Sequence, residues 1–176
     1  SVERIFAAAG MADKVEGTVH NPPARAVTLA LNEPVGVLGI IAPDEQPLLG
    51  LIAMLAPALA MGNTIVAVPS SRWPLLATDL YQIMETSDVP TGAVNIVTGK
   101  SSELAAVLAK HGDVDGMWVV ADGQTCAVAE RESADNLKRV WTSNGTAIDW
   151  HGQDGALERF LQRAIEVKNV WVPYGD

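Results

Sequence analysis

The chain has 176 residues, of which 48% are apolar and 19% are charged, a composition typical of a folded globular domain rather than of disorder. Acidic residues outnumber basic ones by 21 to 12, and the net charge of −9 argues against nucleic acid and membranes as partners. The single cysteine, Cys126, excludes an intrachain disulfide, and no signal peptide opens the given sequence, so we expect a cytoplasmic protein.

The first 32 residues predict a helix followed by extended chain. Residues 1–15 have a helical period that places Val2, Ile5, Phe6, Ala9 and Ala12 on one side. Residues 17–32 lack this period. Their Pro22-Pro23 pair and the apolar run 27–31 indicate an extended arm or an edge strand.

Apolar, β-branched runs then alternate with helical segments. Strands are predicted at 35–42, 64–68, 94–98, 117–120 and 139–142, with helices at 47–61, 73–86, 101–111 and 124–134. This alternation predicts an α/β fold with a doubly wound parallel sheet of about five strands. The uncharged stretch 47–68 is interpreted as buried core, because Pro57 and Gly62-Asn63 break it into a helix and a strand.

The tail departs from this pattern. Residues 156–165 predict a helix, and residues 167–172 alternate like a strand that needs a partner on at least one side. We therefore expect a leading helix (1–16), an extended arm (17–32), a Rossmann-like core (33–147), and a connector helix with a terminal strand (148–176). Trp73 and Trp150 fall in predicted loops or helix starts and are interpreted as marking a surface that packs against another one.

Several of these segments resemble the aldehyde dehydrogenase superfamily. Residues 33–39 and 56–64 are similar to the opening of its coenzyme-binding domain, and residues 89–99 to its PxGVxNxVxG run. Residues 136–140 resemble the segment leading into its central strand, and residues 166–172 resemble its last strand, which serves in oligomer contacts. The pattern fits best the C-terminal, degenerate coenzyme-binding-like domain of the family 16 enzymes. The resemblance implies a Rossmann-like fold, a longer parent polypeptide and NAD(P) as the parent's cofactor.

Other residues stand where this resemblance implies catalytic groups. Glu45 occupies the place of an Asn whose amide stabilises an oxyanion, and a carboxylate cannot donate that hydrogen bond unless it is protonated. Ser143 stands in place of the general-base Glu. The stretch of about 20 residues between that motif and the terminal strand is too short for the domain that carries the family's catalytic cysteine. Asp44 and Glu45 are interpreted as a solvated, helix-capping acidic pair.

The positions implied to bind the cofactor are degenerate too. Val68 and Ser71 replace the Lys and Glu that hold the adenosine ribose, and Ala121 and Asp122 fall in the phosphate loop. We predict that Asp122 caps the following helix itself and repels a pyrophosphate, with an altered phosphate site as the alternative.

Neither a metal site nor a replacement nucleophile is expected. His20, His111 and His151 lack ligand-like spacing. Cys126 is interpreted as a small buried residue, although its place near a helix start leaves slight activation as an alternative.

Two functions follow as hypotheses. The first is a non-catalytic structural or oligomerisation domain of a protein whose parent family oxidises aldehydes with NAD(P). Its partner would be another copy, or an active aldehyde dehydrogenase domain of the same polypeptide, bound through residues 17–32 and 167–172. The alternative is an NAD(P)-binding module that serves chemistry supplied by another domain or chain. The segment alone is predicted to be inactive and to need no cofactor.

Overall fold

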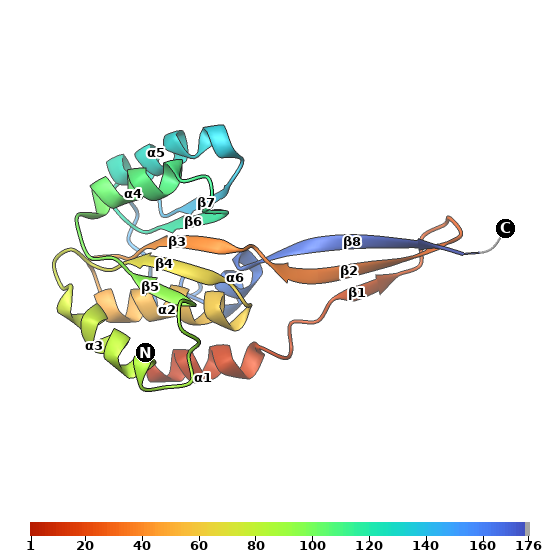
Figure 1. The fold of residues 1–176 in the computed structure, drawn as a ribbon, viewed down its shortest axis with the longest axis horizontal. Coiled ribbons are helices and arrows are strands. Elements are labelled where there is room, and N and C mark those ends of the chain that lie inside the picture. The colour runs from red at the N-terminus through yellow and green to blue at the C-terminus, as the bar shows by residue number, and fades with distance from the viewer. Residues whose placement is uncertain (175–176) are drawn as a thin grey trace.

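The computed structural model describes residues 1–174, in which an α/β body carries a long antiparallel sheet that projects from one side (Figure 1). The helices are α1 (Val2–Met11), α2 (Pro47–Ala60), α3 (Leu75–Glu85), α4 (Ser101–Lys110), α5 (Gly123–Glu132), a 3-10 turn (Ala134–Asn136) and α6 (Leu157–Arg163). The strands are β1 (Thr18–His20), β2 (Ala26–Pro34), β3 (Val37–Ile41), β4 (Thr64–Val68), β5 (Val94–Ile96), β6 (Gly116–Val119), β7 (Arg139–Thr142) and β8 (Ile165–Pro173).

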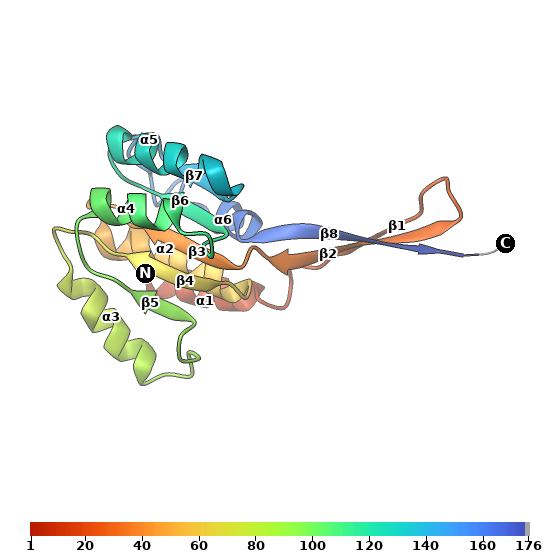
Figure 2. The same cartoon turned by 45° about the horizontal axis from the view of Figure 1, so that its top comes forward.

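Five parallel strands form the body in the order β5-β4-β3-β6-β7. Helices α4 and α5 cover one face of this sheet, and α2, α3 and α6 lie on the other (Figures 1 and 2). The predicted doubly wound α/β fold is therefore confirmed. Strand β3 begins at Val37 instead of residue 35, because Gly36 turns the chain with a φ of 124°.

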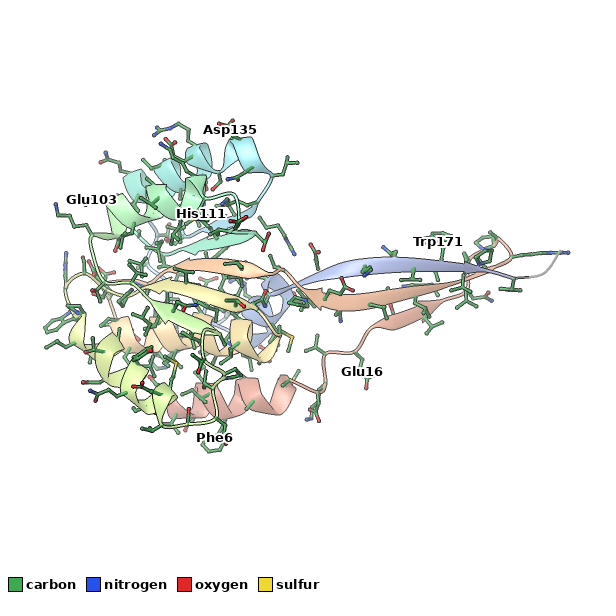
Figure 3. The ribbon with its side chains drawn as sticks, in the orientation of Figure 1. Phe6, Glu16, Glu103, His111, Asp135 and Trp171 are labelled. Carbon is green, nitrogen blue, oxygen red and sulfur yellow. The ribbon has the colours of Figure 1, made fainter. Side chains whose placement is uncertain are left out.

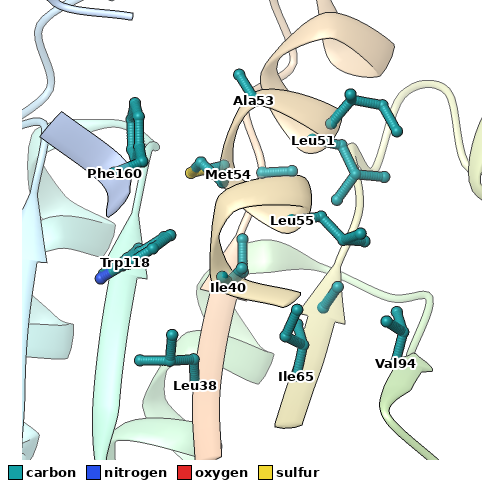
Figure 4. Packing of buried hydrophobic residues seen from close by; sticks show 14 of the residues in the cluster. Leu38, Ile40, Leu51, Ala53, Met54, Leu55, Ile65, Val94, Trp118 and Phe160 are labelled. Atoms are coloured by element: carbon teal, nitrogen blue, oxygen red, sulfur yellow. The ribbon is translucent and has the colours of Figure 1, made fainter. Parts of the chain in front are cut away.

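The larger core cluster lies between α2 and the sheet. Leu51, Met54 and Leu55 of α2 pack over Ile40 and Ile65 (Figure 4). The uncharged stretch 47–68 forms α2 and β4, and most residues of both elements are at least partly buried. The interpretation of this stretch as buried core is therefore confirmed. No helix within residues 1–174 is long and apolar enough to span a membrane.

Phe160 of α6 is the centre of an aromatic cluster. Its ring centroid lies 5.5 Å from that of Trp118, 5.5 Å from that of Trp141 and 6.1 Å from that of Trp150. Trp150 is 2% exposed and belongs to the core cluster that contains α2 and Phe160, so the expectation that it marks an outer surface is wrong. Trp73 is 59% exposed.

The projecting sheet has the strand order β1-β2-β8. Strands β2 and β8 pair antiparallel over nine residues each, from Ala26 opposite Pro173 to Pro34 opposite Ile165. The arm and the tail are thus both strands, as predicted. However, the partner that the tail needs on one side is the arm of the same chain.

Asn63 fastens the root of this projecting sheet to the body. Its buried side chain accepts a hydrogen bond from the backbone N–H of Gly36 at 3.1 Å. It donates to the carbonyl oxygens of Ala58 at 3.0 Å and Ala164 at 2.8 Å. One amide therefore ties the end of α2 to the start of β3 and to the residue before β8.

Helix α1 ends at Met11 and turns its predicted apolar side outward. Phe6 is 75% exposed, and Figure 3 shows it directed away from the body, with Val2 and Ile5 also exposed. Ala8 is the buried residue, and Arg4 donates to the carbonyl oxygens of Trp150 and Gly155. The orientation follows from these contacts, because a small alanine and a hydrogen-bonded arginine together occupy the inner side.

Candidate functional site

A cavity of about 610 Å³ opens at the carboxyl ends of the parallel strands. Its walls are the segments that follow β3, β4, β6 and β7, together with the start of α4. Strand β3 has the next strand β4 on one side and the later β6 on the other, so the cavity lies at a switch point of the sheet. The lining includes Asp44, Glu45, Gln46, Ser71, Arg72, Lys100, Ala121, Asp122, Thr146 and Trp150.

Asp44 belongs to a small polar network at this edge. Its carboxylate accepts a hydrogen bond from the buried Ser70 hydroxyl at 2.5 Å and pairs with Arg72 Nε at 3.3 Å. Ser70 Oγ in turn accepts the backbone N–H groups of Arg72 and Trp73. The interpretation of Asp44 as a helix-capping acid is wrong, because Gln46 is the N-cap of α2 and its side chain makes no capping bond.

Asp122 caps α5, as predicted. Its Oδ1 accepts the backbone N–H groups of Gln124 and Thr125, each at 3.0 Å, and its Oδ2 accepts the Thr125 hydroxyl at 2.8 Å. These bonds, above all the one from the Thr125 N–H, hold the pKa of the Asp122 carboxyl below its usual value. The carboxylate therefore occupies N–H groups that a helix N-terminus would otherwise offer to an anion.

The two cations that line the cavity have carboxylate partners. Arg72 pairs with Asp44, and Lys100 pairs with Glu103 at 3.1 Å. Glu45 is exposed at the mouth. The lining therefore carries three carboxylates (Asp44, Glu45 and Asp122) against two cations, so its charge balance is negative.

The structure brings together four of the six positions singled out in the sequence. Glu45, Ser71, Ala121 and Asp122 line the cavity. Val68 instead packs in the core beneath α4 and α5, where a lysine ammonium would lose its hydration.

Ser143 is also outside the cavity lining. Its hydroxyl donates to the Ala121 carbonyl at 3.4 Å and lies 3.9 Å from Cys126 Sγ. Cys126 is 2% exposed and donates to the same carbonyl at 3.5 Å, so its interpretation as a small buried residue is confirmed.

Sequence reasoning missed Ser70, Arg72, Lys100 and Trp150. Arg72 and Ser70 follow β4 directly, and Lys100 directly precedes α4, so their place after a strand or before a helix was an available signal. Trp150 gave no such signal, because it reaches the cavity through the irregular segment after β7. Within residues 1–174, no group of three or more His, Cys, Asp or Glu side chains is placed to hold a metal ion.

A doubly wound parallel sheet with a cavity at its switch point defines the Rossmann-like class of α/β fold. The sequence profile described as "Aldehyde dehydrogenase family" matches residues 1–147, so the chain belongs to the aldehyde dehydrogenase family.

Relatives agree with this assignment. The chain is 35% identical over 134 residues to an NADP/NAD-dependent aldehyde dehydrogenase of Escherichia coli, covering 76% of this chain and 27% of that protein. It is 37% identical over 133 residues to human retinaldehyde dehydrogenase 3, covering 75% of this chain and 26% of that protein. The chain therefore spans about a quarter of the length of these relatives.

Solved structures are similar as well. A betaine aldehyde dehydrogenase from Staphylococcus aureus in complex with NAD+ superposes with a TM-score of 0.75 at 31% identity, over 80% of this chain and 28% of that one. The protein PnpE from Pseudomonas sp. WBC-3 superposes with a TM-score of 0.74 at 35% identity, over 80% of this chain and 30% of that one.

Proposed function

We propose that this segment is a non-catalytic assembly domain of an aldehyde dehydrogenase family protein that resembles the family 16 branch. The projecting sheet is the observation that carries the proposal. Its strands β2 and β8, of nine residues each, pair with one another and extend away from the body together with the three-residue β1 (Figure 1). Val167, Trp171 and Val172 are exposed on β8, and Figure 3 shows Trp171 on this sheet. Exposed apolar groups on a projecting sheet favour contact with another protein surface.

The residues at the family's catalytic positions support a non-catalytic role. Glu45 is an exposed carboxylate, which accepts hydrogen bonds but does not donate them and therefore cannot stabilise an oxyanion. The Ser143 hydroxyl is a weak base and points to the Ala121 carbonyl. We infer that any oxidation of aldehydes with NAD(P) belongs to another part of the parent protein.

The partner in this proposal is a second copy of the chain or an active aldehyde dehydrogenase domain of the same polypeptide. Residues 17–32 and 167–172 make the contact, and the protein works in the reducing cytoplasm, where the single Cys126 stays a thiol. The domain boundaries that we propose remain 1–16, 17–32, 33–147 and 148–176.

Two matched tryptophan variants test the assembly role. Trp171 on the projecting sheet and Trp73 on the body are 61% and 59% exposed. We expect Trp171→Ser to raise the Kd for self-association of the 176-residue chain at least tenfold, as measured by sedimentation velocity. The reason is that exposed tryptophans are frequent binding hot spots. Trp73→Ser should leave association unchanged. Association that depends on Trp73 and not on Trp171 would contradict the proposal.

The switch-point cavity favours NAD(P) binding as a second candidate function. Against it, Asp122 uses the helix N–H groups and the cavity lining is acidic on balance, which fits a dinucleotide pyrophosphate poorly. Calorimetric titration with NAD and NADP separates the two candidates. A Kd tighter than about 1 mM, equivalent to roughly −4 kcal/mol, would favour the binding module.

A further inference from the structure

The outer face of α3 is exposed and partly apolar. The helix lies at the margin of the body next to the edge strand β5 (Figures 1 and 2). Its inner side carries its three buried residues, which are Ala77, Leu80 and Met84. On the opposite side, Leu75 is 74% exposed and Ile83 is 64% exposed. Asp79 and Gln82 are exposed between them, and this helical spacing places all four side chains on one side, which we call the α3 face.

The segment that contains α3 is acidic throughout. Residues 73–99 include Asp79, Glu85 and Asp88 but no Lys, Arg or His, so this segment alone carries −3 of the net charge of −9. All three carboxylates are exposed, and none of them forms an ion pair within residues 1–174. The α3 face therefore combines apolar side chains with carboxylates that have no cationic partner in the described chain.

The C-terminal end of α3 brings like charges together. A helix C-terminus has a partial negative charge that favours a nearby cation, and the last turns of α4, α5 and α6 carry Lys110, Arg131 and Arg163. Helix α3 has no basic residue in its last turn; it ends on Glu85, and Asp88 follows three residues later. A cation supplied by a partner would relieve this repulsion.

A second copy of this chain is poorly suited to the α3 face. Among the helices of residues 1–174, only α6 has a net positive charge. Its Arg159 already pairs with Asp154, and its Phe160 and Leu161 are buried. Contact with other parts of a second acidic body would add like charges. The complementary surface therefore belongs to a different protein.

We propose that the α3 face binds a basic amphipathic helix of a partner protein. The apolar side of that helix covers Leu75 and Ile83, while its Lys or Arg side chains reach Asp79 between them and Glu85 at the end of α3. Apolar contact supplies affinity, and the charge pairs set the orientation and exclude acidic partners. This surface lies on the body and is separate from the projecting sheet, so it does not depend on the assembly role proposed above.

A designed peptide of about 18 residues, or five helical turns, tests this docking surface. Its Leu residues form one side of the helix and its Lys residues the other, and fluorescence anisotropy of the labelled peptide measures its Kd for the 176-residue chain. We expect Asp79→Lys to raise this Kd at least tenfold, because like charges then face each other. Leu75→Ser should raise it at least fivefold, since an apolar contact is lost.

Two variants on α4 and the turn after it are matched controls. Asp113→Lys reverses an exposed carboxylate that forms no ion pair within residues 1–174, and Val107→Ser removes an apolar side chain that is 59% exposed. Both should change the Kd less than about twofold, because residues outside a contact contribute little to affinity. If Asp113→Lys weakened binding as much as Asp79→Lys, the peptide would be attracted to the acidic chain as a whole, and the α3 site would be overturned.

A peptide of the same composition in scrambled order, which has no apolar side, should bind at least tenfold more weakly. Equal binding of the two peptides would overturn the proposal. Trp171→Ser should leave peptide binding unchanged, so a failure of docking and a failure of the assembly role are seen separately. Self-association that is weakened by Leu75→Ser, without binding of the amphipathic peptide, would identify a second copy as the occupant and overturn a basic partner.

Discussion

Asp122 caps a helix at a position where the family resemblance implies a phosphate. An aspartate is a good N-cap, and here it satisfies the first N–H groups of α5 from within the chain. The same bonds place a negative charge where the family resemblance implies a phosphate. The carboxylate therefore stabilises the helix, and we expect it to repel an anionic ligand.

Asp122→Ala should lower the free energy of unfolding by about 1 kcal/mol, because α5 loses its cap. Asp122→Asn should cost less, because asparagine also accepts hydrogen bonds at this position. Urea denaturation of the three proteins at neutral pH provides the measurement. Equal stability of the alanine variant and the native chain would show that the cap does not stabilise the fold.

The pH dependence of this residue has a definite sign. The folded state lowers the pKa of Asp122, so the stabilisation by its carboxylate is complete above the unfolded pKa of about 3.9. It is lost as the pH falls through the lower folded pKa. The stability difference between the native chain and Asp122→Asn should therefore shrink when urea titrations are repeated near pH 3. A difference that grows on acidification would contradict this assignment.

Among the elements, α6 lies in the segment that joins β7 of the body to β8 of the projecting sheet, and it packs into the core through Phe160. Its Phe160 is fully buried among three tryptophan rings, whereas Phe6, the other phenylalanine of the chain, is 75% exposed. Phe160→Ala should lower the free energy of unfolding by about 3–5 kcal/mol. Phe6→Ala is the matched control and should change it by less than about 0.5 kcal/mol. Similar losses for both variants would mean that the aromatic cluster does not hold α6.

The Asn63 amide should control how firmly the projecting sheet is held. Asn63→Ala leaves the Gly36 N–H without this acceptor and weakens the tie to Ala164, and each buried group left unsatisfied costs about 1–3 kcal/mol. We expect lower stability and faster amide exchange along β8, with Asn21→Ala, an exposed asparagine, as the control. Unchanged exchange in β8 would contradict the fastening role.

The type and the ends of an element could be predicted where they depend on residues within that element. Strands β4 and β7 have the predicted ends, because turn residues or helix ends bound their short apolar runs. The outward turn of α1 was not predictable, since it depends on the contacts of Ala8 and Arg4 with distant segments. Likewise, the alternation in β8 revealed a strand, but only the folded chain shows that β2 is its partner.

The candidate site divides in the same way. The cap by Asp122 is a local feature and could be read from the sequence. The Asp44–Ser70–Arg72 network joins the ends of two strands that are distant in the chain, and the burial of Trp150 depends on packing. The sequence places Asp44, Ser70 and Arg72 after strands, but it does not show that they meet.

In the whole molecule, an acidic α/β body carries a projecting sheet that is neutral, because residues 17–34 and 165–174 contain two basic and two acidic side chains. The body has the fold of the aldehyde dehydrogenase family, and we propose that the sheet is the surface for assembly. This division explains why the charge of −9 need not prevent association.

Sedimentation velocity of the unmodified 176-residue chain over a concentration series is the most direct test of the proposed assembly role. We expect a species larger than the monomer, whose proportion rises with concentration and which forms without NAD(P). A monomer at every concentration, together with submillimolar binding of NAD(P), would contradict it and favour a cofactor-binding module.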